Sequence, residues 1–254
     1  IGIGRIGAAH SLGTILGPAI AYFSIISLLA PIYLAAVMTF LAAILVMLYL
    51  PSLPIAKTTA VVSKKLRYTD KRILPFMVVG IAMFTGFSVV QQTLGYYFQD
   101  KLGLTAEVTA QQVGIAMMGS AIAALIMQLV VVQRLGWTPF RLMRVGLPFM
   151  LMGFVGLTLG GDLLEFILAM ALVGTGIGMS APGFSAAATL AVKPEEQGAV
   201  AGLISACPAL GFIVGPILGG ALYQFHATSP YIVSATLFIP LVLFSWRMKG
   251  RDMV

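Results

Sequence analysis

Three glutamines are the side chains of this sequence whose type and position suggest binding chemistry, because each lies within a long apolar stretch. Gln91 and Gln92 are adjacent, so on a helix they point about 100° apart, and Gln128 lies in the next stretch. An amide in an apolar phase needs a polar partner or a wet cavity. We therefore expect at least one of the adjacent pair to face a ligand cavity; hydrogen bonding between helices is the alternative.

Bulky apolar side chains complete the predicted substrate cavity. They are Phe87, Tyr96, Met117 and Met179. Methionine adapts its shape to different partners, so this cavity suits a hydrophobic or amphipathic small molecule better than a phosphate or a sugar. No charged residue lies in the middle of an apolar stretch. We therefore expect no catalytic group, metal or cofactor within these stretches, and the sequence does not indicate an enzyme.

The elements that carry these residues follow from composition. Of the 254 residues 59% are hydrophobic and 9% are charged, against roughly 45–50% and 25% in soluble domains. A water-soluble domain is thereby excluded, and so is a disordered chain. Eight stretches are long and apolar enough to cross a bilayer as helices: 4–24, 29–50, 72–98, 108–133, 139–160, 163–190, 196–224 and 229–247. The predicted fold is an all-α polytopic membrane bundle.

Charge placement tests this set of spans. Eight alternating spans put fourteen of the fifteen Lys and Arg residues on one side and only Lys101 on the other. The positive-inside rule then places both termini and the basic loop 51–71 in the cytoplasm, as expected for a bacterial inner membrane protein. Anionic lipid headgroups are the expected partners of this face, so the net charge of +7 does not indicate nucleic acid.

A glycine–proline element occurs twice. Leu12–Pro18 and Leu210–Pro216 align at an offset of 198 residues, which pairs Gly13, Gly17 and Pro18 with Gly211, Gly215 and Pro216. Glycines four apart, continued by Gly219, give a helix a smooth stripe on which a neighbour packs closely and slides, and the proline bends the helix at the end of its stripe. Static packing is the alternative interpretation of the stripe.

The repeat also predicts the domain organisation. The second copy lies six spans after the first, so both run in the same direction, as in a transporter built from two six-helix halves. Residues 1–50 would be the last two helices of the first half, 51–71 the linker and 72–254 the second half. Four helices are then expected before residue 1.

Two local patterns predict further details. The span 163–190 contains four glycines and Pro182 between positions 174 and 183, which favours an interruption or flexible bend. Asp162 and Glu165 stand at the start of this span, where acidic side chains cap a helix. We expect them to cap and not to couple ions.

The element at Gly13, Gly17 and Pro18 resembles the fifth-helix motif of twelve-helix drug:proton antiporters in the major facilitator superfamily. Ala21 and Tyr22 replace its two final glycines, whereas the second copy extends to Gly219 and Gly220. The resemblance implies a monomeric secondary transporter that exports a small hydrophobic compound by alternating access in exchange for protons, with proton carriers in helices one to four. A proton-linked metabolite importer and a non-transporting membrane scaffold are the alternatives.

Overall fold

The computed structural model of the chain describes residues 20, 27, 29–49 and 67–248. The expected first span 4–24, with Gly13, Gly17 and Pro18, lies outside the described residues apart from position 20, and so does most of the linker. The helices are α2 (Ala30–Tyr49), α3 (Leu74–Leu102), α4 (Ala106–Ile126), α5 (Pro139–Leu159), α6 (Leu163–Leu190), α7 (Gln197–Phe225) and α8 (Ser229–Arg247). A π-helical segment, Met127–Val132, continues α4, and a short 3-10 turn, Pro194–Glu196, precedes α7.

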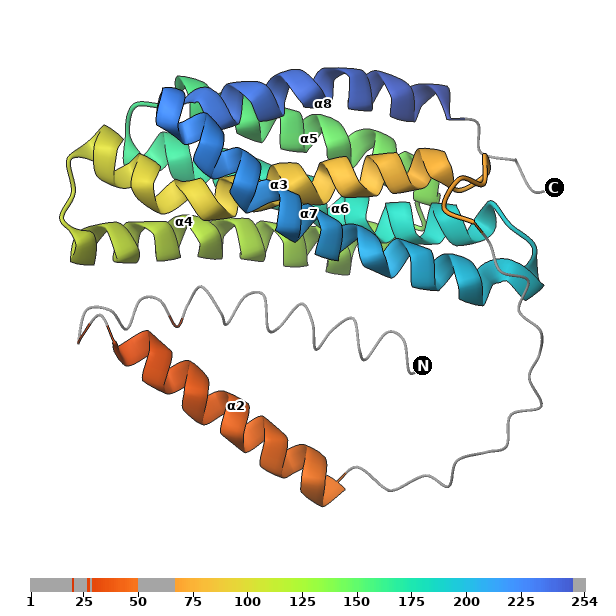
Figure 1. Cartoon of the computed structure of the whole chain (residues 1–254), viewed down its shortest axis with the longest axis horizontal. Helices are drawn as coiled ribbons and strands as arrows, with labels where there is room; N and C mark the ends of the chain where they lie inside the picture. The colour runs from red at the N-terminus through yellow and green to blue at the C-terminus, as the bar shows by residue number, and fades with distance from the viewer. Residues whose placement is uncertain (1–19, 21–26, 28, 50–66, 249–254) are drawn as a thin grey trace.

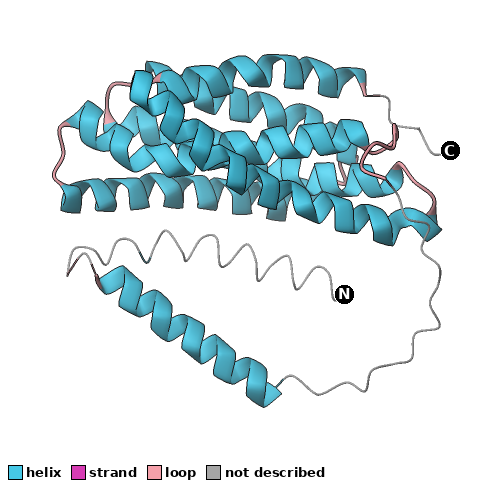
Figure 2. Ribbon diagram, viewed as in Figure 1, coloured by secondary structure: helices cyan, strands magenta, loops and turns pink. Residues whose placement is uncertain are grey.

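All regular structure in the described part of the chain is helical (Figure 2). Seven helices there are long and apolar enough to cross a membrane. This confirms an all-α membrane fold and seven of the eight predicted spans. The helices α3 to α8 form one bundle, in which α7 lies across α3 (Figure 1). The helix α2 buries none of its side chains.

Local signals set several helix ends. Gly103 follows α3 with φ 62°, a left-handed conformation that ends a helix and suits glycine. The Thr138 side chain accepts a hydrogen bond from the backbone N–H of Arg141 at the start of α5. Asp162 accepts one at 2.9 Å from the N–H of Glu165, which confirms the predicted cap of α6.

Glycines of α6 pack against two neighbouring helices. A Cβ at Gly174 or Gly178 would collide with the backbone of α4, whereas one at Gly176 or Gly183 would collide with the backbone of α5. An interruption near Pro182 is wrong, because α6 is continuous from Leu163 to Leu190; the alternative, a flexible bend, stays a prediction. In lipid the helix keeps its own hydrogen bonds, and its glycines allow close approach on two sides instead of breaking it.

Buried polar contacts tie α3 to distant helices. The Tyr97 hydroxyl donates a hydrogen bond to the Leu157 carbonyl of α5 at 2.9 Å. The hydroxyls of Thr93 and Tyr231 lie 3.1 Å apart and join α3 to α8. These three polar side chains are at most 1% exposed, so their hydrogen bonds satisfy groups that cannot reach water.

Candidate functional site

The glycine stripe of α7 lies against α3. A Cβ at Gly211 would lie 2.6 Å from the Cβ of Phe84, and one at Gly215 would lie 2.5 Å from the Cβ of Ser88. Gly219 is the third buried glycine of the stripe. Carbon atoms in contact normally stand about 3.5–4.0 Å apart, so only glycine fits at the first two positions without moving a helix. The two helices therefore meet almost backbone to backbone.

Pro216 directly follows this contact. Both Pro208 and Pro216 lie inside α7, which is nevertheless one helix from Gln197 to Phe225. A proline in a helix removes one hydrogen bond and crowds the preceding turn. A bend at the end of the stripe stays a prediction.

Four of the predicted cavity residues lie on α3. Phe87 packs, partly buried, against the hydrophobic core of the bundle, and Gln91 is also partly buried. Gln92 is exposed, and Tyr96 is 61% exposed. These last two are four residues apart and therefore share one face of the helix. An amide and a phenol thus stand one turn apart on an accessible surface.

The other three predicted cavity residues lie elsewhere. Met117 of α4 is partly buried against the hydrophobic core. Met179 of α6 is 2% exposed and belongs to a small cluster with Val131 and Leu142. Gln128 is partly buried within the π-helical segment that continues α4. Packing between α6, α5 and the segment that continues α4 thus explains the burial of Met179. Gln128 lies in a π-helical turn, a distortion that is frequent at functional sites.

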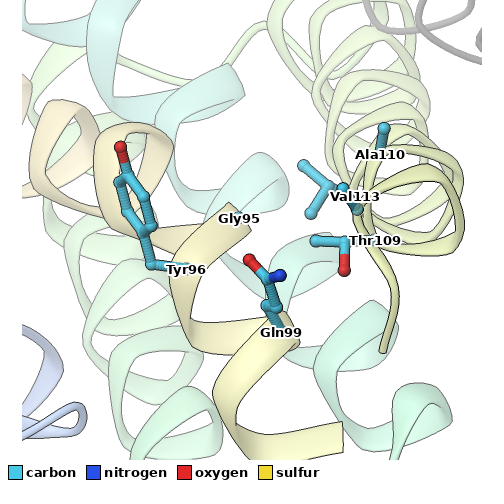
Figure 3. A pocket seen from close by; sticks show the side chains of 7 residues that line it. Gly95, Tyr96, Gln99, Thr109, Ala110 and Val113 are labelled. Atoms are coloured by element: carbon cyan, nitrogen blue, oxygen red, sulfur yellow. The ribbon is translucent and has the colours of Figure 1, made fainter. Parts of the chain in front are cut away.

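A pocket of about 280 Å³ lies between the end of α3 and the start of α4. It is lined by Gly95, Tyr96, Gln99, Ala106, Thr109, Ala110 and Val113. Figure 3 shows the Gln99 side chain between Tyr96 of α3 and Thr109 of α4, while the ring of Tyr96 points away from α4. Of the seven predicted cavity residues, only Tyr96 contributes to this wall.

The pocket residues Gln99 and Thr109, and nearby Gln112, were missed by the sequence analysis. The Oγ1 atom of Thr109 and the Oε1 atom of Gln112 are buried without a hydrogen-bond partner. The spacing of Thr109 and Gln112 could have indicated them, because two polar residues three positions apart at the start of an apolar helix lie on one face. What could not be read from the sequence is that α3 supplies the facing wall.

Charged groups connect helices at both ends of the bundle. At the end where α3 begins, Arg72 contacts Asp70 at 2.8 Å and Glu196 at 2.9 Å. The hydrogen bonds from Arg72 hold the pKa of the Asp70 carboxyl below its usual value. At the opposite end, the Tyr223 hydroxyl of α7 donates a hydrogen bond to Asp100 of α3. These contacts fasten α3 to α7 and to the turn before it, at either end of the glycine stripe.

No charged side chain lines the pocket. Within the described ranges, no group of three or more His, Cys, Asp or Glu side chains is placed to hold a metal ion. The one cysteine, Cys207, is buried in α7. The lining of this pocket therefore offers neutral hydrogen bonding beside apolar surface.

Comparison with known proteins agrees with this architecture. The model of the Major Facilitator Superfamily matches residues 1–207 and 161–252. Multidrug resistance protein 1 of Bacillus subtilis (strain 168) is 26% identical over 260 aligned positions, which cover 98% of this chain and 65% of that protein. The chain thus spans slightly less than two thirds of the length of this relative. Because the family match covers most of the sequence, including both glycine–proline elements, the chain belongs to the Major Facilitator Superfamily.

Proposed function

We propose that this protein acts in secondary active transport, moving a small hydrophobic or amphipathic compound across the membrane by alternating access, outward and in exchange for protons. The observation that carries the proposal is the backbone-to-backbone contact of Gly211 and Gly215 with α3, on a chain of this family. The name of the Bacillus subtilis relative, a multidrug resistance protein, supports a drug-like cargo.

The glycine contact supports a moving interface on physical grounds. Large interlocking side chains hold two helices in one register, whereas a surface without side chains permits sliding and rocking at low cost. We assign this role to the stripe Gly211, Gly215 and Gly219 with Pro216, and the equivalent role to Gly13, Gly17 and Pro18 in the other half. In this proposal residues 1–50 belong to the first half, 51–71 link the halves, and 72–254 form the second half.

The exposed face of α3 is the proposed substrate wall. Gln92 and Tyr96 stand one turn apart on that face, so an amide and an aromatic ring are available to one ligand. Gln91 and Phe87 lie beside them, partly buried. A wall with neutral polar groups and no carboxylate suits an amphipathic compound.

Proton coupling is assigned to residues outside 72–254. Between residues 72 and 248 the acidic side chains stand at helix ends and in loops, away from the middle of the predicted spans, and Asp252 follows the last predicted span in the sequence. A carboxylate that carries a proton through a membrane protein needs to lie within the spans. We further propose that the protein resides in a bacterial inner membrane as a monomer with both termini in the cytoplasm, where its basic loops meet anionic lipid headgroups.

Transport of a hydrophobic fluorescent dye into inverted membrane vesicles tests the proposal. We expect accumulation that collapses when nigericin dissipates the pH gradient, because export from cells corresponds to uptake by inverted vesicles. We also expect Tyr96→Ala to raise KM for the dye. Tyr68→Ala is the matched control. The two tyrosines are similarly exposed, Tyr68 at 65% and Tyr96 at 61%, but Tyr68 lies in the loop before α3.

Three results would contradict parts of this proposal. Accumulation that persists without a pH gradient would rule out proton exchange. Dye uptake by right-side-out vesicles alone would indicate import. An equal KM for both tyrosine variants would remove Tyr96 from the substrate wall.

A further inference from the structure

An aromatic pair joins α3 and α7 near the C-terminal ends of both helices. The ring centroids of Tyr96 and Tyr223 are 6.1 Å apart, and the rings are tilted by 50°. Tyr96 is 61% exposed and Tyr223 is partly exposed. Aromatic rings attract each other when their centroids lie about 4.5–7 Å apart. The two tyrosines therefore form one accessible aromatic surface that spans both helices.

A carboxylate holds the second ring of this pair. The hydroxyl of Tyr223 donates a hydrogen bond to Asp100, which follows Tyr96 by four residues and so lies on the same side of α3. Asp100 stands in the last turn of α3, where a negative charge is unfavourable for the helix. None of the ion pairs in the described part of the chain involves Asp100. The contact with Tyr223 is thus the interaction that explains a carboxylate at this position.

The surface of α7 one turn before Tyr223 is bare. Gly220 is exposed, and a Cβ there would meet nothing within 4 Å. Gly220 precedes Tyr223 by three residues, so the two lie on nearly the same side of the helix, and a long helical side chain leans over the preceding turn. A flat molecule can therefore lie against the tyrosine rings without meeting a side chain at Gly220.

Aromatic rings select the shape of their partner. Stacked and edge-to-face aromatic pairs gain affinity beyond that of the area they bury. A saturated ring of the same carbon skeleton buries a similar area, but it is puckered and has no π-system. Gln92, exposed one turn before Tyr96, offers a hydrogen bond to a polar substituent of the ligand. The surface thus favours flat aromatic compounds over saturated ones.

We propose that Tyr223 is a specificity-determining residue of the substrate wall, which with Tyr96 selects compounds that contain a flat aromatic ring. Asp100 is a positioning residue that acts through the Tyr223 hydroxyl. The inference rests on the proposed function, because it takes the exposed face of α3 as the substrate wall. It adds α7 to that wall, so one ligand contacts both helices that meet at the glycine stripe, and a shift of α7 along α3 changes the separation of the two rings.

Equilibrium dialysis without any ion gradient tests the inference separately from transport. The full chain in phospholipid nanodiscs is dialysed against tritiated 2-naphthalenemethanol, and empty nanodiscs give the blank. The fully saturated analogue, decahydro-2-naphthalenemethanol, is the matched probe, because it has the same carbon skeleton and hydroxyl but no aromatic ring. The dissociation constant Kd of each probe is measured for the unaltered chain and for each variant.

Loss of the Tyr223 ring should weaken binding of the aromatic probe alone. Tyr223→Leu should raise Kd for 2-naphthalenemethanol about two- to tenfold, as expected for the loss of one aromatic contact, and leave Kd for the saturated analogue nearly unchanged. Tyr68→Leu is the matched control, since Tyr68 is 65% exposed but lies in the loop before α3. It should change neither Kd.

Two replacements separate the hydrogen bond of Asp100 from its charge. Asp100→Leu removes the acceptor, so Kd for the aromatic probe should rise, though by no more than in Tyr223→Leu. Asp100→Asn keeps a carbonyl oxygen that accepts the Tyr223 hydroxyl, and should bind like the unaltered chain. Tyr223→Phe should match Asp100→Leu, and the variant with both changes should be no weaker than either, because each removes the same hydrogen bond.

Several results would overturn the inference. An unaltered chain that binds both probes equally well would lack the proposed selectivity. An equal loss for both probes in Tyr223→Leu would show that Tyr223 only fastens the helices, and no loss would remove it from the wall. Asp100→Asn as weak as Asp100→Leu, or additive losses in the combined variant, would end the positioning role of Asp100.

The two proposals fail separately. Dye accumulation driven by a pH gradient, together with any of these results, leaves the proposed function standing and removes only the inference. Selective binding of the aromatic probe that depends on Tyr223, in a chain that accumulates no dye, removes the proposed function and keeps the binding surface.

Discussion

Replacing Gly211 by alanine separates α7 from α3, and the size of the effect follows from the contact. The added Cβ would lie 2.6 Å from the Cβ of Phe84 and 2.8 Å from the backbone nitrogen of Thr85. Backbone atoms cannot rotate away as a side chain tip can. Since carbon contacts need about 3.5 Å or more, α7 has to retreat by about 1 Å along this stretch.

Two opposing contributions set the stability of Gly211→Ala. Overpacking of this kind costs about 1–3 kcal/mol, while alanine in place of glycine favours a helix by about 1 kcal/mol. We expect a net loss of up to about 2 kcal/mol, or a melting temperature lower by up to about 8 °C. Gly220→Ala is the matched control on the same helix, because a Cβ there meets nothing within 4 Å. It keeps only the favourable contribution and should raise the melting temperature.

Thermal unfolding of the two purified variants in the same detergent measures this difference. The signs should be opposite, lower for Gly211→Ala and higher for Gly220→Ala. Equal melting temperatures would mean that the helices separate freely in the native protein, and the inferred close contact of α7 with α3 would be refuted.

Two further predictions concern polar contacts. Tyr97→Phe should lower the free energy of unfolding by about 1–2 kcal/mol, because a buried carbonyl of α5 loses its donor, whereas Tyr96→Phe, at an exposed position, should change it little; thermal melts of both variants compare them directly. The contact of Arg72 with Asp70 should stabilise the protein at neutral pH and lose this effect on acidification. The pKa of Asp70 is lower in the folded than in the unfolded chain. The stabilisation is therefore complete above the unfolded pKa and disappears as the pH falls through the folded pKa. The difference in melting temperature between the unaltered protein and Arg72→Gln should therefore become smaller from pH 7 to pH 3. A difference that stays constant over this range would contradict the prediction.

The spans were predictable because a bilayer imposes one length on all of them. Seven of the predicted stretches coincide with helices to within a few residues at each end. The largest shift is at the end of α3, which was expected at residue 98 and runs to Leu102, where Gly103 ends it with positive φ. Helix existence is a local property of about twenty residues, so composition is sufficient to find it.

Contacts between helices were less predictable, because hydrophobicity all round a helix does not show which side meets which neighbour. Gly174 and Gly178 were interpreted as helix breakers from their intrinsic propensity, yet they are the positions at which α4 approaches α6. Met179 was assigned to a cavity for its residue type and lies in a packed cluster. The pocket at Thr109 needs α3 and α4 to be placed side by side, which no single stretch of sequence specifies.

The distance along the chain between Thr93 and Tyr231 has a consequence for biosynthesis. The two residues are 138 positions apart, and ribosomes add roughly 5–20 residues per second, so roughly 7–28 seconds pass between the synthesis of Thr93 and that of its partner. During that interval its hydroxyl can donate to the Val89 carbonyl one turn earlier, a bond that the finished protein retains at 2.8 Å. The side-chain amide of an asparagine or glutamine has two N–H donors, so one such bond would leave the other donor unpaired, whereas threonine places its single donor within its own helix and still provides a contact for the helix that is made last.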